Sequence, residues 1–170
     1  MRFEELYKSR YSVRSFENKM ISREELKKIY DAGIYVPSAK NRQPLKVYVV
    51  KSNEAIEKIN RVSRCIFGSP VVFICCFDHT QVSIRKDGKK NAGVQDVSIA
   101  VTQMMLEAWN LGIGSCWINL FDEEKLKEEF DIPDHIEPVC LLDLGYPSKD
   151  SIPLELHHIK KTEKEIFEEV

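Results

Sequence analysis

Three short segments of the sequence carry the side chains best suited to chemistry. The first is Arg10-Tyr-Ser-Val-Arg14, in which two guanidinium groups and a hydroxyl recur at every second residue. Because alternate residues of an extended chain share one face, Arg10, Ser12 and Arg14 can converge on one phosphate through charge-assisted hydrogen bonds. The alternative interpretation is a solvated strand edge, where surface arginines usually lie.

The second and third segments offer amides and an aromatic ring. Between Pro37 and Pro44, Asn41 and Gln43 place amide groups at alternate positions of a loop. Amides both donate and accept hydrogen bonds and so suit the edge of a heterocycle, although a plain polar turn would use the same residues. The third segment, residues 112–119, brings a tryptophan and the backbone amides of a strand to the end of a helix, with core packing as the alternative.

Composition and missing motifs exclude several classes of function. The sequence contains no GxGxxG, P-loop, GxSxG, CxxC or HExxH motif, so we expect neither acyl transfer nor a metal site. A formal net charge of -2 gives no overall positive field for nucleic acid or anionic lipid. No apolar run approaches the roughly 20 residues of a membrane span. We therefore expect a cytoplasmic protein with reduced thiols and with neither nucleic acid nor a membrane as partner.

The elements that must position these segments follow from length and periodicity. A chain of 170 residues with 43% hydrophobic content fits one domain, residues 1–170. Helices are predicted over residues 4–9, from a cap at Ser22 to before Pro37, from a cap at Asn53 to Val62, over residues 92–111, and from a cap at Asp122 to Phe130. Strands are predicted over residues 45–50, 71–77, 115–120 and 139–144. Thr162 and Glu165 predict a last helical turn.

The order of these elements predicts a helix-flanked sheet of mixed strand direction. The helix over residues 92–111 is apolar over more than one stripe, so we expect it to be both the central helix and an intersubunit helix. Residues 78–91, rich in lysine and aspartate, are predicted to form a mobile excursion.

Taken together, the segments resemble the nitroreductase family of flavin oxidoreductases over nearly the whole chain. The resemblance is carried by RxSxR followed by Phe16, by PSAxNxQP over residues 37–44, by SPVVF over residues 69–73, by LGIGSCWI over residues 111–118 and by LGYP over residues 144–147. It implies an α+β fold with a mixed, largely antiparallel sheet. It also implies an intertwined homodimer with two FMN sites built from both subunits.

The resemblance assigns roles by position. Arg10 and Ser12 would lie at the FMN phosphate. Tyr11, between them in the sequence, is also a candidate for FMN binding. Arg14 would approach the N1 side of the ring. A cation there raises the flavin potential and eases hydride acceptance from NADH or NADPH, so no side chain needs to be catalytic. The remaining candidates for FMN binding are Pro37, Ser38, Ala39, Asn41 and Gln43 from the partner subunit's copy of the loop, then Trp117, Ile118 and Asn119 beside the ring, and Arg64, Lys160 and Lys161 as further cations.

Some positions depart from the family pattern. Leu45 stands where many relatives have tryptophan, and Leu120 stands where some have glycine, so access to the flavin could differ. The tail lacks the clearer Lys-x-Arg element of some relatives, and a solvated tail is the alternative interpretation for Lys160 and Lys161.

The function implied is an FMN-dependent oxidoreductase that passes electrons from NAD(P)H to a small acceptor, such as a nitroaromatic or a quinone, by a ping-pong mechanism. A non-catalytic FMN carrier or redox sensor is the alternative. A thiol-based regulator using Cys65 or Cys116 is a third hypothesis.

Overall fold

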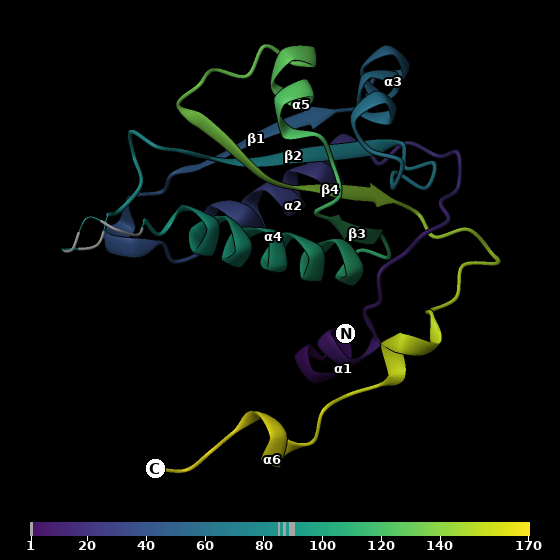
Figure 1. Ribbon diagram of the computed structural model, residues 1–170. Coiled ribbons are helices and arrows are strands. Elements are labelled where there is room, and N and C mark those ends of the chain that lie inside the picture. Colours follow the sequence, from purple (N-terminus) through teal and green to yellow (C-terminus); the bar gives the residue numbers. More distant parts are fainter. Residues whose placement is uncertain (1, 85, 87, 89–90) are drawn as a thin grey trace.

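The core of the molecule is a four-stranded antiparallel sheet, seen in the computed structural model, which describes residues 2–84, 86, 88 and 91–170. The strands lie in the order β1-β2-β4-β3, so the two long strands occupy the centre (Figure 1). Their bounds are Leu45–Val50 for β1, Val71–Asp78 for β2, Gly114–Ile118 for β3 and Ile136–Gly145 for β4.

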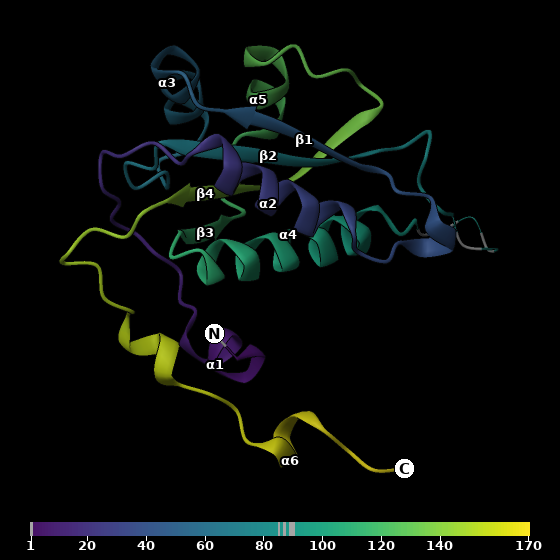
Figure 2. The same cartoon turned by 180° about the vertical axis from the view of Figure 1, so that it is seen from behind.

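Helices cover both faces of this sheet. The 18-residue helix α4 packs with α2 on one face, and α3 lies with α5 on the other (Figures 1 and 2). The helices are α1 (Phe3–Ser9), α2 (Arg23–Ile34), α3 (Asn53–Val62), α4 (Gly93–Asn110), α5 (Glu123–Glu129) and α6 (Glu163–Ile166), with short 3-10 turns η1 (Ala39–Asn41) and η2 (Glu155–His158).

The apolar run in β2 explains why two helical layers are needed. Successive side chains of a strand point to opposite faces. Phe73 and Phe77 therefore enter the core between the sheet and helices α2 and α4. Val72 and Ile74 enter the core on the other face, between the sheet and helices α3 and α5. All four side chains are almost fully buried. The strand predicted over residues 71–77 is therefore a central strand that is covered on both faces.

Most predicted elements are confirmed, with four differences. Strand β4 begins at Ile136, three residues before the predicted start. The cap of α3 is Ser52, whose side chain accepts a hydrogen bond from the Ala55 N–H, rather than Asn53. Strand β3 ends at Ile118, before Leu120. The prediction of mixed strand direction is wrong for the four named strands, which all pair antiparallel. Parallel pairing occurs between Ser12 and Ser115, in an isolated bridge.

The predicted excursion over residues 78–91 is only partly described. Asp78 belongs to β2, and Ile84 pairs with Asn91 in an isolated bridge. Residues 85, 87, 89 and 90 lie outside the described part of the chain.

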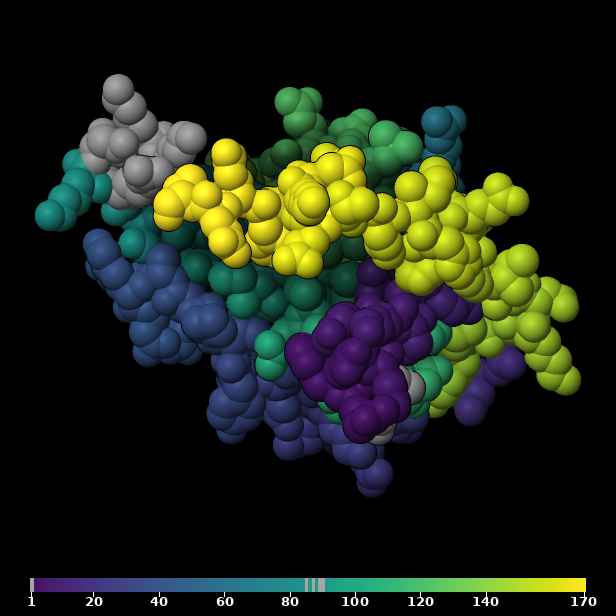
Figure 3. Space-filling model, turned by 90° about the horizontal axis from the view of Figure 1, so that it is seen from below, coloured from purple at the N-terminus to yellow at the C-terminus, as the bar shows by residue number. Residues whose placement is uncertain are grey.

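The C-terminal tail, residues 148–170, leaves the sheet and runs along the side of the molecule that carries α1 (Figures 1 and 3). It exposes large apolar side chains, with Leu156 73% and Phe167 71% accessible. The predicted capping box is present, because the Thr162 N–H donates to the Glu165 carboxylate at 2.8 Å. Within the described residues, no helix has the length and apolar character that crossing a membrane requires.

Candidate functional site

The segment from Arg10 to Arg14 lies in an extended conformation beside β3. The Val13 N–H donates to the Ser115 carbonyl oxygen at 3.0 Å. The Val13 side chain is fully buried, whereas Ser12 is half-buried and Arg14 is exposed. This alternation is the one expected for an extended chain, so the polar side chains lie on the face away from the core. The structure thus confirms the local conformation predicted for this segment.

Gly114 allows this close approach. A Cβ atom built at Gly114 would lie 2.6 Å from Cγ2 of Val13 and 3.1 Å from Cγ of Pro147. Any side chain at this position would push the segment away from β3, because such distances are well inside van der Waals contact. Gly114 therefore lets Val13 pack close to β3, and this packing positions Ser12 and Arg14 on either side of Val13.

The tail returns to this segment and forms a hollow of about 190 Å³ with it. The Tyr11 hydroxyl donates to the Ser151 carbonyl oxygen at 3.0 Å, and the Tyr11 ring meets the His157 ring edge-on at 6.3 Å. Leu154 and Leu156 complete the lining together with Ser12, Arg14 and His157. Nothing in the sequence pointed to these tail residues, because they follow the arginines by about 140 positions and share no motif with them.

Positive charge gathers around this hollow. The pKa of His157 is lowered first by burial and then by the positive charges of Lys160, His158 and Arg10. Lys160 contacts the carbonyl oxygen of His157, so it belongs to this neighbourhood. Lys161 is exposed on the following stretch of tail. Burial also lowers the pKa of Arg10, which marks its guanidinium as partly withdrawn from water.

Arg64 lies in the hollow next to the end of β3. Together with Leu120, it lines a space of about 460 Å³ between the end of α3 and the connection to α5. The Ser63 hydroxyl holds these walls together by donating to the Leu120 carbonyl oxygen at 2.7 Å. The Arg14 guanidinium lies 5.9 Å from the centroid of Phe67, three residues after Arg64.

The residues at the end of β3 differ in what they can offer. The Trp117 indole N–H donates to Oδ1 of Asn119 at 2.6 Å, which fixes both side chains. The Ile118 side chain is buried in the core, so this residue can offer a ligand only its backbone. One chain therefore places the arginine segment, Arg64 and residues 117–119 around a single strand.

The buried pair Cys116 and Asp143 lies directly beneath this site, in register on β3 and β4. Asp143 is 0% exposed, and neither carboxyl oxygen has a hydrogen-bond partner within the described residues. Burial raises the pKa of Asp143 to about 9, so its side chain is a neutral acid at pH 7. It adds no negative charge beneath the arginines.

The thiol of Cys116 is also uncharged, and it is therefore unreactive. Burial raises its pKa to about 11, although the charges of Arg14 and Arg10 act in the opposite direction. A thiol reacts as the thiolate, so a protonated, buried thiol is a poor nucleophile. The structure therefore argues against the hypothesis of a regulator based on Cys116.

The loop over residues 37–44 lies elsewhere in the same chain. It is tied to the first turns of α4, where the Ala39 N–H donates to the Asp96 carboxylate at 2.9 Å. The arginine segment is tied to the last turn, where Tyr11 meets Trp109 edge-on at 5.2 Å. At 1.5 Å per residue, Asp96 and Trp109 lie about 20 Å apart along the helix. One chain therefore does not bring this loop together with the arginine segment.

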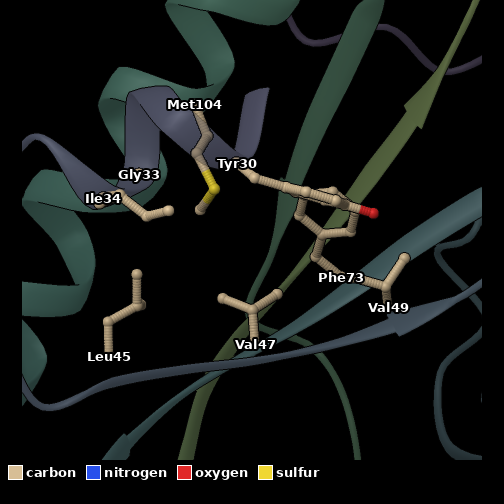
Figure 4. Close-up of a pocket in the computed structure, with 8 residues that line it drawn as sticks. All are labelled: Tyr30, Gly33, Ile34, Leu45, Val47, Val49, Phe73 and Met104. Carbon is tan, nitrogen blue, oxygen red and sulfur yellow. The ribbon is translucent and has the colours of Figure 1, made fainter. Parts of the chain in front are cut away.

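An apolar hollow of about 290 Å³ separates α2 from β1, on the sheet edge away from β3 (Figure 4). We call it the β1–α2 groove. The side chains of Tyr30, Ile34, Leu45, Val47, Val49, Phe73 and Met104 line it together with Gly33. No charged side chain is part of this lining, so the groove is suited to apolar contacts rather than to phosphate binding.

Comparison with known proteins places this fold in one class of oxidoreductases. The structure superposes on a nitroreductase family protein of Clostridium difficile with a TM-score of 0.92 and 34% identity, covering 99% of this chain and 98% of that one. It also matches a nitroreductase of Exiguobacterium sibiricum solved in complex with FMN, with a TM-score of 0.88, 20% identity and coverage of 100% and 98%. At that identity the second likeness shows the fold alone.

The sequence gives the same assignment. The model of the nitroreductase family matches residues 7–68 and 63–146. A protein of Methanothermobacter thermautotrophicus named as an NADH dehydrogenase/NAD(P)H nitroreductase is 32% identical over 153 residues, which cover 86% of this chain and 78% of that protein. The chain belongs to the nitroreductase family and is an oxidoreductase of that family. The predicted resemblance is confirmed.

Proposed function

We propose that the chain is an FMN-dependent oxidoreductase that takes electrons from NADH or NADPH and passes them to an electron-poor small molecule such as a nitroaromatic or a quinone. The observation that carries this proposal is the extended Arg10–Arg14 segment held against β3. The FMN complex of the Exiguobacterium relative, which shares the fold, supports it. Residues 1–170 form one FMN-binding domain in this proposal.

The residues present fit the phosphate of FMN. The Arg10 guanidinium and the Ser12 hydroxyl supply donors two residues apart on an extended chain, and charge-assisted hydrogen bonds are the strong contacts for such a dianion. The adjoining hollow is bounded by Tyr11 and His157, with Lys160 nearby. In our proposal Arg10, Tyr11 and Ser12 bind the phosphate, and Lys160 and Lys161 add positive charge.

The residues around the end of β3 fit the ring of FMN, whose bound form supplies reversible two-electron hydride chemistry. Trp117 and Ile118 would flank the ring, and the Asn119 backbone N–H would donate to N5. Arg14 and Arg64 would place positive charge beside the pyrimidine part, where the reduced ring becomes negative. These residues bind and orient. None of them needs to move a proton. In our proposal, NADH or NADPH and the electron acceptor use the same face of the FMN ring in turn.

We further propose that the site is completed in a homodimer, with the loop of Pro37, Ser38, Ala39, Asn41 and Gln43 coming from the partner subunit. The separation of about 20 Å along α4 supports this, because one chain leaves the loop remote from its own arginines. Two unpartnered apolar surfaces also support it, namely the C-terminal tail and the β1–α2 groove. In an intertwined dimer, each would be covered by a second copy.

Sedimentation of the FMN-loaded chain tests the dimer. We expect a species of about twice the 19.7 kDa of one chain, with the flavin absorbance moving at the protein boundary. Replacing Phe167 by aspartate in the tail should shift the distribution toward monomer and release FMN. The matched control is Glu169→Gln, which changes one charge near the same exposed end. A monomer that retains FMN would contradict the shared site.

The absorption spectrum of protein purified without added cofactor tests the proposed activity. We expect a yellow protein whose visible flavin bands bleach within seconds when NADH or NADPH is added without oxygen. Stable colour in the presence of both donors would favour the non-catalytic carrier or sensor. A colourless protein that ignores added FMN would exclude both functions.

A further inference from the structure

The loop over residues 37–44 has an unusual backbone that must be held by contacts from outside the loop. Lys40, Asn41 and Gln43 have φ angles of 56°, 54° and 51°. Residues with side chains rarely adopt this left-handed region, because Cβ then crowds the carbonyl oxygen. Three such residues in four positions form a conformation that the loop does not hold by its own preferences.

The hydrogen bond between the Ala39 N–H and Oδ1 of Asp96, at 2.9 Å, supplies that external support. Asp96 lies in the first turns of α4, and its side chain is only 4% exposed. Burying a carboxyl group is unfavourable unless hydrogen bonds compensate for the lost water. If the residue at this position served packing alone, burying an apolar side chain would cost less free energy than burying a carboxyl group.

The second carboxyl oxygen of Asp96 is also buried, and it has no hydrogen-bond partner within the described residues. Asp96 lines a small cavity of about 140 Å³ behind the loop, together with Ser38 and Gln43. The Ser38 hydroxyl accepts a hydrogen bond from the Gln43 N–H at 3.0 Å, which closes the loop on itself. The loop is therefore tied at Ala39 to α4 and internally from Ser38 to Gln43.

These ties leave two polar groups at the exposed tip of the loop. The Gln43 side-chain amide donates to Oδ1 of Asn41 at 3.1 Å, so the two side chains hold each other in place. This bond uses the oxygen of Asn41 and the nitrogen of Gln43. It leaves the NH₂ group of Asn41 as a donor and the carbonyl oxygen of Gln43 as an acceptor. A neighbouring donor and acceptor match the edge of an imide-like heterocycle.

We infer that Asp96 is the positioning residue that holds the loop so that this donor and acceptor pair is presented to the ring of the cofactor. The inference rests on the proposed function, because the cofactor is FMN in the site completed by the loop. Asp96 itself does not touch the cofactor. It acts through Ala39 and through the backbone of the residues that follow.

Amide hydrogen exchange at Ala39 in the FMN-free, full-length protein tests the anchor directly. In Asp96→Ala the Ala39 N–H loses its buried acceptor, so we expect its exchange to accelerate at least 10-fold. Asp96→Asn keeps a side-chain oxygen and should restore most of the protection. The Val101 amide, in the middle of α4, reports whether the helix is still folded and should exchange as in the wild type. Unchanged exchange at Ala39 in Asp96→Ala would overturn the inference.

Titration of the same variants with FMN, followed by flavin fluorescence, tests the positioning role. We expect Asp96→Ala to weaken FMN binding at least 10-fold and Asp96→Asn to remain within about threefold of the wild type. A variant that frees Ala39 yet binds FMN normally would overturn positioning by Asp96. Wild-type protein that binds no FMN would overturn the proposed function instead, and the exchange measurement separates the two failures.

Discussion

Replacing Asp143 by asparagine is expected to remove the loss of stability that the buried Asp143 carboxyl group causes as the pH rises above 4. Between pH 4.5 and pH 7.5, the free energy of unfolding of the wild type should fall by up to about 4 kcal/mol more than that of the variant. Urea unfolding at a fixed protein concentration measures the difference, since a fixed concentration removes the effect of association.

The sign of this effect follows from the burial of Asp143. Its pKa is about 9 in the folded chain, because the side chain is fully buried, and about 4 in the unfolded chain. Between these values the folded state binds more protons at Asp143 than the unfolded state does, so the contribution of Asp143 to stability is greatest below pH 4 and falls until about pH 9. Asparagine does not ionise, so its contribution stays constant over this range.

Two further variants make the measurement decisive. Asp143→Leu removes the unpartnered carboxyl group altogether and should be more stable than the wild type at pH 7.5, because an apolar side chain needs no hydrogen bond in this core. Asp134→Asn makes the same chemical change at an exposed position and should retain the wild-type pH profile. Parallel profiles for the wild type and Asp143→Asn would show that Asp143 is not held neutral.

Local patterns predicted the elements well where the signal lies within a few residues. The capping box of Ser22 and Glu25 marks the start of α2, and the Ser22 N–H does donate to the Glu25 carboxylate. The β-branched run over residues 45–50 gives β1 with its observed bounds. The α3 cap was misplaced by one residue, because Ser52 and Asn53 are both good caps and only the backbone conformation distinguishes them.

The candidate site was predicted only in part, because it depends on which elements meet. Alternation in the RxSxR segment gave its exposed face, but the pairing of Ser12 with Ser115 is a contact between distant residues that no local pattern contains. In the sequence, Asp143 is a single acid in an apolar run, and Asp96 is a single acid in a helix that is mostly apolar. Asp96 anchors a loop, whereas the Asp143 carboxyl group has no hydrogen-bond partner within the described residues. Only the three-dimensional structure shows this difference.

Replacing Arg14 by alanine is expected to slow reduction of the bound flavin by NADH or NADPH by about 10-fold or more. A charge-assisted contact contributes about 1.5–3 kcal/mol, and each 1.4 kcal/mol changes a rate tenfold. The Arg14 guanidinium is held by donating to the Ser12 carbonyl oxygen at 3.2 Å and by the Phe67 ring, so its charge is fixed beside the proposed ring site. Anaerobic stopped-flow absorbance measures the rate at which the flavin bands bleach.

Two control variants separate the charge of Arg14 from its shape and from the total charge of the protein. Arg14→Lys keeps a cation without the planar guanidinium and should give an intermediate rate. Lys51→Ala removes one positive charge just after β1, at the opposite edge of the sheet from β3, and should leave the rate unchanged. Because Asp143 is neutral beneath this site, the arginine charge is not cancelled at pH 7. An Arg14→Ala protein that is reduced at the wild-type rate would show that this charge does not assist the hydride transfer.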